Sequence, residues 1–220
     1  MQRIPEPELM DDPAQALAYA RADFSAPHDN FVALFMERFG TALDGTVLDL
    51  GCGPGDICRR LARALPDCKI LGVDASRAML ELATADTEKH ALSERIGYHL
   101  GYLPDARLPC RHYDAVVSNS LLHHLKHPAA LWQSLQKFAR PGAPVFVMDL
   151  MRPASRAAAS QLVEEYARGE PELLQRDFFN SLLAAYRPRE VRLQLEHSGL
   201  AELQVETVSD RHFIVFGHLG

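Results

Sequence analysis

The sequence of 220 residues has no long apolar run, no paired-cysteine motif and no strong excess of basic charge. Its apolar runs stop well short of the ~18 residues that a membrane-spanning helix needs, so we expect no membrane partner. The first six residues lack the apolar core of a secretion signal, which favours a cytoplasmic location. The net charge of −6 argues against a nucleic-acid partner, because phosphate binding takes clustered Lys and Arg.

The four cysteines, at positions 52, 58, 68 and 110, form no CxxC pair and no regular framework. This spacing argues against both a cysteine zinc site and a disulfide scaffold, and we expect no bound metal. The length suits one domain over residues 1–220 and is enough to bury a core. The 47% hydrophobic and 24% charged fractions are ordinary for a globular protein.

The centre of the sequence is the stretch TVLDLGCGPGD, residues 46–56. Its apolar first half predicts a short buried strand, and a helix should begin near Asp56. The glycines at 51, 53 and 55 let the backbone of the turn approach a ligand closely, with the free N–H groups of the helix aimed at it. The alternative is a tight strand-to-helix connection without a ligand.

A second strand, residues 69–74, ends in Asp74, which lies 19 residues after Gly55. In nucleotide-binding folds an acid about 20 residues beyond the glycine turn reaches the ribose hydroxyls. Asp74 can therefore accept hydrogen bonds from both hydroxyls of an adenosine. Its alternative role is to cap the helix expected over residues 76–87.

Further alternation of strands and helices predicts a mostly parallel sheet that is covered on both faces. Strands are expected at 96–100, 113–119 and 145–150, followed by a hairpin of 203–208 and 212–216 with a turn at 209–211. Helices are expected at 131–138, 154–167, 171–185 and 189–198. Residues 14–39 should form two helices divided at 25–30, with Asp29 or Asn30 as the second cap, after a loose terminus over residues 1–12.

The GxGxG turn just after Asp49 resembles the first motif of class I S-adenosylmethionine (SAM)-dependent methyltransferases. The dinucleotide fingerprint is GxGxxG instead. The aromatic-Asp pair Tyr113-Asp114 that opens a strand, the following LLHHL turn and the RPG turn before the next strand are similar to the same family's pattern. No single motif identifies the family, but their order does, from about residue 44 to 149.

The resemblance implies an α/β fold, a Rossmann-like seven-stranded mostly parallel sheet that ends in an antiparallel hairpin. It implies SAM as cofactor, S-adenosylhomocysteine as its product, and a helical cap (1–40) and helical lid insertion (153–187). On this pattern the cofactor residues are Asp49, Gly51, Cys52, Gly53, Asp74, Ala75, Met79, Leu103, Asp105 and Asn119. The family often has Gly-Asp after the third strand, whereas Tyr102 stands at that position here, so Asp105 is assigned to the adenine edge.

Catalytic and substrate residues are less constrained by the sequence, because the methyl donor already carries the reactivity. If the acceptor is a hydroxyl or an ammonium, His123, His124 or Asp149 could remove its proton. The alternatives are a structural histidine between leucines and an Asp149–Arg152 pair that anchors a loop. The residues assigned to the acceptor are Tyr19, Phe24, Arg152, Phe179 and Tyr186, although aromatics at helical spacing can equally form core.

The leading hypothesis is methyl transfer to a small-molecule acceptor, because the chain is acidic and has little length for an RNA-binding module. The alternatives are a methyltransferase of RNA or protein, a nucleotide-dependent oxidoreductase, and a SAM-binding module without catalysis. A homodimer is compatible with the sequence. The acceptor and the methylated atom are not predicted.

Overall fold

A computed structural model describes residues 1–6 and 12–220 and contains one seven-stranded sheet in these ranges. The strands are β1 (Gly45–Leu50), β2 (Cys68–Asp74), β3 (Ile96–Leu100), β4 (Ala115–Asn119), β5 (Pro144–Leu150), β6 (Gln204–Thr207) and β7 (His212–His218). Their spatial order is β3-β2-β1-β4-β5-β7-β6, and only β7 runs against its neighbours β5 and β6. The predicted Rossmann-like sheet with a closing antiparallel hairpin is confirmed.

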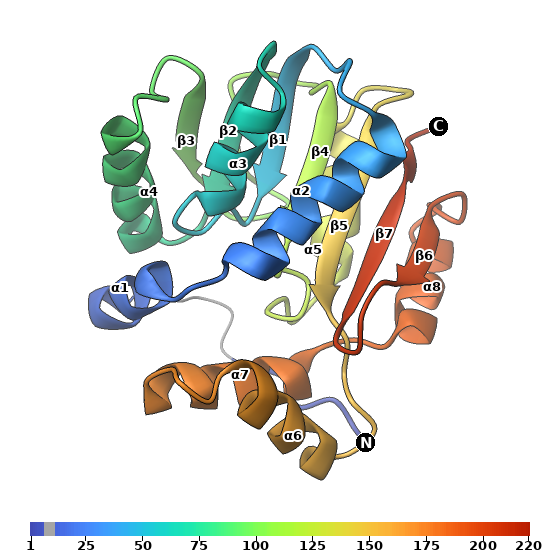
Figure 1. The fold of residues 1–220 in the computed structure, drawn as a ribbon. Coiled ribbons are helices and arrows are strands. Elements are labelled where there is room, and N and C mark those ends of the chain that lie inside the picture. Colours follow the sequence, from blue (N-terminus) through green and yellow to red (C-terminus); the bar gives the residue numbers. More distant parts are fainter. Residues whose placement is uncertain (7–11) are drawn as a thin grey trace.

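Helices cover both faces of this sheet, as Figure 1 shows. One face carries α2 (Ser25–Phe39), α3 (Asp56–Ala64) and α4 (Arg77–Lys89), and the other carries α5 (Ala129–Phe138) and α8 (Pro188–His197). Alternation along the strands feeds both layers, since Val47 packs with the α2 and α3 residues while Leu48 packs with Trp132 of α5. Both strand faces are apolar, as buried parallel sheets require.

The remaining helices lie beyond the carboxyl ends of the parallel strands (Figure 1). They are α1 (Pro13–Arg21), α6 (Arg156–Tyr166) and α7 (Glu172–Ala184), and α1 contacts both α4 and α7. Ligands of open α/β sheets bind at this edge, so these helices stand where a bound molecule would be covered. None of the helices in the described ranges has the length and apolar character needed to span a membrane.

The break between the first two helices differs from the sequence prediction. It lies at residues 22–24, and α2 already begins at Ser25, so neither Asp29 nor Asn30 caps a helix. Pro27 does not interrupt α2, because the N–H groups of a first helical turn have no partner within the helix and a proline loses nothing there. The turn is held instead by Asp23, whose carboxylate accepts a hydrogen bond from Ser25 N at 2.9 Å.

The expected loose terminus is wrong for residues 1–6, and residues 7–11 lie outside the described part of the chain. The amide of Ile4 donates to the carbonyl of Leu183 in α7 at 3.0 Å. The Arg3 guanidinium donates to the carbonyl of His123 at 2.8 Å and lies over the Tyr186 ring at 4.2 Å. The N-terminal segment is therefore packed between α7 and the turn that follows β4.

Candidate functional site

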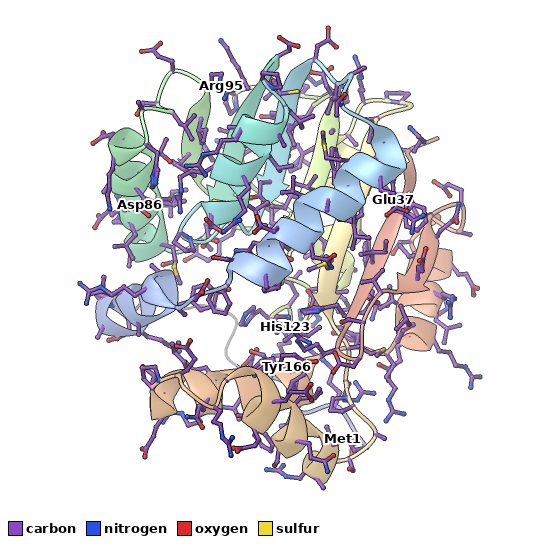
Figure 2. The ribbon with its side chains drawn as sticks, viewed as in Figure 1. Met1, Glu37, Asp86, Arg95, His123 and Tyr166 are labelled. Carbon is purple, nitrogen blue, oxygen red and sulfur yellow. The ribbon has the colours of Figure 1, made fainter. Side chains whose placement is uncertain are left out.

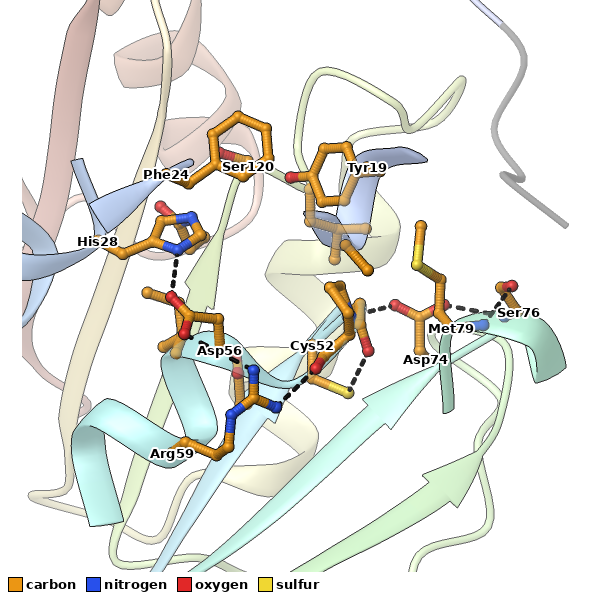
Figure 3. A pocket seen from close by; sticks show the side chains of 18 of the residues that line it. Tyr19, Phe24, His28, Cys52, Asp56, Arg59, Asp74, Ser76, Met79 and Ser120 are labelled. Carbon is orange, nitrogen blue, oxygen red and sulfur yellow. Dashed lines mark hydrogen bonds and ion pairs between the residues drawn. The ribbon is translucent and has the colours of Figure 1, made fainter. Parts of the chain in front are cut away.

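A cavity of about 520 Å³ opens at the carboxyl ends of β1, β2 and β4. The glycine turn after β1 forms one side, and residues of α1 and of the α1–α2 turn form the opposite side (Figure 3). Eleven of the sequence-assigned cofactor and acceptor residues line it: Tyr19, Phe24, Asp49, Gly51, Cys52, Gly53, Asp74, Ala75, Met79, Leu103 and Asn119. One predicted base, His124, lines it as well.

The glycine turn has the open backbone that the sequence predicted. Gly53 has φ +50°, and a Cβ atom placed on it would meet no protein atom within 4 Å, so free space borders the turn at this residue. Gly51 is constrained differently, because a Cβ there would lie 2.7 Å from the Leu121 side chain. The amides of Gly51 and Cys52 both donate to the Val73 carbonyl, which fixes the turn against β2.

Asp74 holds the turn and the start of α4 together. One carboxylate oxygen accepts from Gly53 N and the other from Ser76 N, both at 2.8 Å. The helix cap itself is Ser76, whose hydroxyl accepts from Met79 N at 3.2 Å, so Asp74 is not the cap of α4. Each carboxylate oxygen can accept more than one hydrogen bond, which leaves Asp74 able to bind ligand hydroxyls.

Two buried acceptor oxygens in the cavity wall lack a protein partner within the described residues. These are Asp49 Oδ1 and Asn119 Oδ1. The other Asp49 oxygen accepts from the Cys58 thiol at 3.2 Å. Burial raises the pKa of Asp49 to about 7. Buried acceptors without a donor are costly, so these oxygens indicate that a bound molecule or water donates to them.

Aromatic residues form the wall opposite the glycine turn (Figure 3). The rings of Tyr19 and Phe24 lie 4.8 Å apart, and Phe24 contacts His28 at 5.5 Å. His28 Nδ1 lies 2.7 Å from Asp56 Oδ2 at the start of α3. Burial favours a higher pKa for Asp56, but hydrogen bonds from His28 and Arg60 outweigh it and hold that pKa well below its usual range. The α1–α2 turn is thus anchored to α3 by an ionised carboxylate.

A second polar group lies behind the cavity, in the turn after β4. The buried Asp149 carboxylate accepts from Leu122 N at 2.7 Å and pairs with His123 Nδ1 at 2.6 Å. Burial favours a lower pKa for His123, but the charges of Asp149 and Glu6 outweigh it, and the pKa is raised. Neither His123 nor Asp149 lines the cavity, whereas His124 does.

The other sequence-assigned residues lie elsewhere. Asp105 is exposed in the loop after β3, and Arg152, Phe179 and Tyr186 are also outside the cavity lining. Arg152 pairs with Glu190 and donates to the Ala185 carbonyl at 2.8 Å. The alternative of an Asp149–Arg152 pair is therefore wrong. Phe179 lies beside Arg156 of α6, 5.2 Å from its guanidinium carbon.

Sequence reasoning missed His28, Asp56, Tyr102 and Leu121 among the residues that line the cavity. Asp56 carried a signal, since it is the first residue of the helix that follows the glycine turn. Tyr102 had one too, because it replaces the expected acid. His28 had none, because its place depends on how α2 crosses the sheet.

Comparisons with known proteins agree with this geometry. Residues 47–142 match the model of a methyltransferase domain family. The ubiquinone biosynthesis O-methyltransferase of Hydrogenovibrio crunogenus is 31% identical over 122 residues, which is 54% of this chain and 48% of that protein. The 2-phytyl-1,4-naphtoquinone methyltransferase of Synechococcus elongatus is 31% identical over 110 residues, or 50% and 47% of the two chains. The chain thus spans about half the length of these two relatives.

A solved structure extends the likeness in fold to almost the whole chain. The SAM-dependent methyltransferase of Aquifex aeolicus superposes with a TM-score of 0.67 at 20% identity, covering 95% of this chain and 99% of that one. The matched segment, residues 47–142, contains the glycine turn, Asp74 and Asn119, all of which line the cavity. The chain belongs to the family of class I SAM-dependent methyltransferases.

Proposed function

We propose that this protein transfers a methyl group from SAM to a small-molecule acceptor that binds in the cavity beside the glycine turn. The observation that carries the proposal is the convergence in one cavity of an open glycine turn, a strand-end carboxylate and two buried acceptor oxygens without donors. Sequence motifs placed these residues on three different strands, and β1, β2 and β4 are adjacent in the sheet.

The lining fits the cofactor group by group. Asp74 would accept from the ribose hydroxyls. Asp49 Oδ1 and Asn119 Oδ1 would accept from the ammonium of the methionine part, which supplies the donors they lack. Apolar contact would come from Cys52, Ala75, Met79 and Leu103. Bound SAM supplies a methyl group on a positively charged sulfur, so the protein need not generate a strong electrophile.

The task left to the protein is to align the acceptor, exclude water and take up a proton. Tyr19 and Phe24 provide an apolar wall across from the glycine turn, and we assign the acceptor to this side. His124 would remove the proton of an acceptor hydroxyl, because its imidazole lines the cavity and is neutral-to-charged near physiological pH. His123 and Asp149 would act behind it, where they hold the turn in place.

A small acceptor is favoured over RNA or protein by the net charge of −6 and by the helices that stand over the carboxyl edge of the sheet. Two relatives are named for quinone substrates, which suggests an aromatic hydroxyl or ring carbon as the methylated atom. The helices α6 and α7 would serve as the lid, and α1 and α2 as the cap. Phe179, Tyr186 and Arg152 remain predictions for acceptor binding, since they lie outside the present lining.

Calorimetry with S-adenosylhomocysteine and with NAD tests the cofactor assignment directly. We expect the first to bind at one site per chain and the second not to bind. Turnover is then tested with SAM labelled on the methyl group against a panel of hydroquinones, phenols and amines. Binding without turnover on any acceptor would favour the SAM-binding module, and preference for NAD would overturn the proposal.

A further inference from the structure

Three metal-ligating side chains converge beside the cavity, on segments that are far apart in the sequence. Glu6 Oε1 lies 3.2 Å from His124 Nδ1 and 3.6 Å from His123 Nε2, and the three atoms all lie within 4.8 Å of one another. We propose that Glu6, His123 and His124 bind a divalent transition-metal ion of the zinc class. Figure 2 places His123 between the strand ends and the helices α6 and α7.

The donor set suits such an ion. Two imidazole nitrogens and one carboxylate oxygen are zinc ligands, whereas magnesium and calcium prefer oxygen donors alone. Atoms bound tetrahedrally to zinc at ~2.0–2.2 Å lie about 3.3–3.5 Å apart. The two distances that involve Glu6, 3.2 and 3.6 Å, already match this spacing.

Groups behind the ligands hold them in orientation, as in established metal sites. His123 uses Nδ1 for the Asp149 carboxylate at 2.6 Å, which leaves Nε2 as the nitrogen that faces Glu6. A carboxylate on the second ring nitrogen is the usual support of a metal-binding histidine. The Ser181 hydroxyl of α7 donates to Glu6 at 3.0 Å, and the two imidazole rings pack at 4.1 Å.

The sequence gave no reason to expect this site, because the metal search there rested on cysteine spacing. Glu6 reaches the histidines only because the N-terminal segment is anchored by Ile4 on the Leu183 carbonyl and by Arg3 on the His123 carbonyl. A bound ion would tie this segment to the turn after β4. It would therefore stabilise the folded chain, since the unfolded chain does not hold the ligands together.

The place of the ion also bears on the chemistry, and this step rests on the proposed function. Three protein ligands leave a fourth zinc position for water or a substrate oxygen, the number found in catalytic rather than structural sites. His124 lines the cavity, so the ion lies at its wall. An acceptor hydroxyl that reached this position would lose its proton more readily at neutral pH.

The test uses the full chain without a histidine tag, stripped of metal with a chelator. ZnCl₂ is titrated by calorimetry, and CoCl₂ is titrated by visible absorption, which reports tetrahedral coordination. We expect one ion per chain, and binding at least tenfold weaker in His124→Ala and in Glu6→Gln. The matched control is His127→Ala, an exposed histidine three residues further on that is outside the cluster.

Two further measurements remove competing explanations. All variants carry Cys110→Ser, because that exposed thiol can bind zinc. Circular dichroism and S-adenosylhomocysteine affinity are measured on each variant, so a folding defect or loss of the cofactor site is seen separately from loss of metal. No binding by the stripped protein, or equal binding by all variants, would overturn the proposal and leave a hydrogen-bonded Glu6–His124 pair. Cofactor binding without metal binding would leave the proposed function intact.

Discussion

Replacing Gly53 by alanine adds one methyl group where the glycine turn borders the cavity. The added carbon would meet no protein atom within 4 Å, so the protein itself has room for it. The only folding cost is that of a positive φ of +50°, which is about 1–2 kcal/mol for a residue with a Cβ atom. A cofactor lying against this turn would lose the same space. We therefore expect cofactor affinity to fall while the fold survives.

Gly142 offers a matched control for this substitution. It has φ +76°, a Cβ there also meets nothing within 4 Å, and it lies outside the cavity lining, in the turn before β5. Gly53→Ala and Gly142→Ala should thus lose similar stability, about 1–2 kcal/mol each by urea unfolding. Only Gly53→Ala should bind S-adenosylhomocysteine at least tenfold more weakly, a loss of about 1.4 kcal/mol in calorimetry.

Equal cofactor affinity in the two variants would refute the reasoning, because the turn would then not border the ligand. A large stability loss in Gly53→Ala alone would also count against it, since a hidden steric contact would explain any weakened binding. Circular dichroism spectra recorded on the same samples check that both variants keep the helical content of the unmodified chain.

Four other changes test separate parts of the structure. Asp74→Ala should weaken S-adenosylhomocysteine binding by about 1–3 kcal/mol in calorimetry, the loss expected for charge-assisted hydrogen bonds. Asp105→Ala should leave it unchanged, because Asp105 is outside the cavity lining, and a weaker affinity would restore the adenine assignment. Asp49 titrates at 3.8 as a free side chain and at about 7 in the fold, so its contribution to stability is full below pH 4 and is lost as pH rises through 7. Urea unfolding of Asp49→Asn should lack this slope, worth roughly 4 kcal/mol, and an identical slope in both proteins would contradict the assignment. Phe146→Ala should cost about 3–5 kcal/mol, since its ring packs edge-on against Phe31 and Phe35, and a loss below 1 kcal/mol would mean that α2 is not docked there.

Much of the fold could be predicted because its signals are local. The strand and glycine turn of residues 46–56, the helix that begins at Asp56 and the closing hairpin all appear where apolar periodicity and turn residues indicate. The misplaced boundary between α1 and α2 shows the limit of this reasoning. Pro27 and Asp29 resemble a helix start, yet the first helical turn tolerates proline, and the start was set by Asp23 and Ser25 instead.

The cofactor side of the site could also be predicted, because its residues follow directly from the ends of three neighbouring strands. The parts that were missed depend on contacts between distant segments. His28 meets Asp56 across 28 residues, and Glu6 meets His124 across 118 residues. No pattern within a short window encodes such pairs, since they form only when whole helices and the N-terminal segment dock on the sheet.

The pairing of Asp149 could have been predicted from strand geometry, and it shows how a local rule decides between two partners. Side chains of an extended strand alternate, so residues three apart, such as Asp149 and Arg152, point to opposite faces and do not meet readily. Asp149 therefore turns to the neighbouring strand β4, whose following turn presents Leu122 N and His123 Nδ1. Arg152 turns instead to the Ala185 carbonyl and to Glu190 at the start of α8. Because Asp149 is thus committed to the histidine turn, its carboxylate can orient His123 but is not free to bind the acceptor itself.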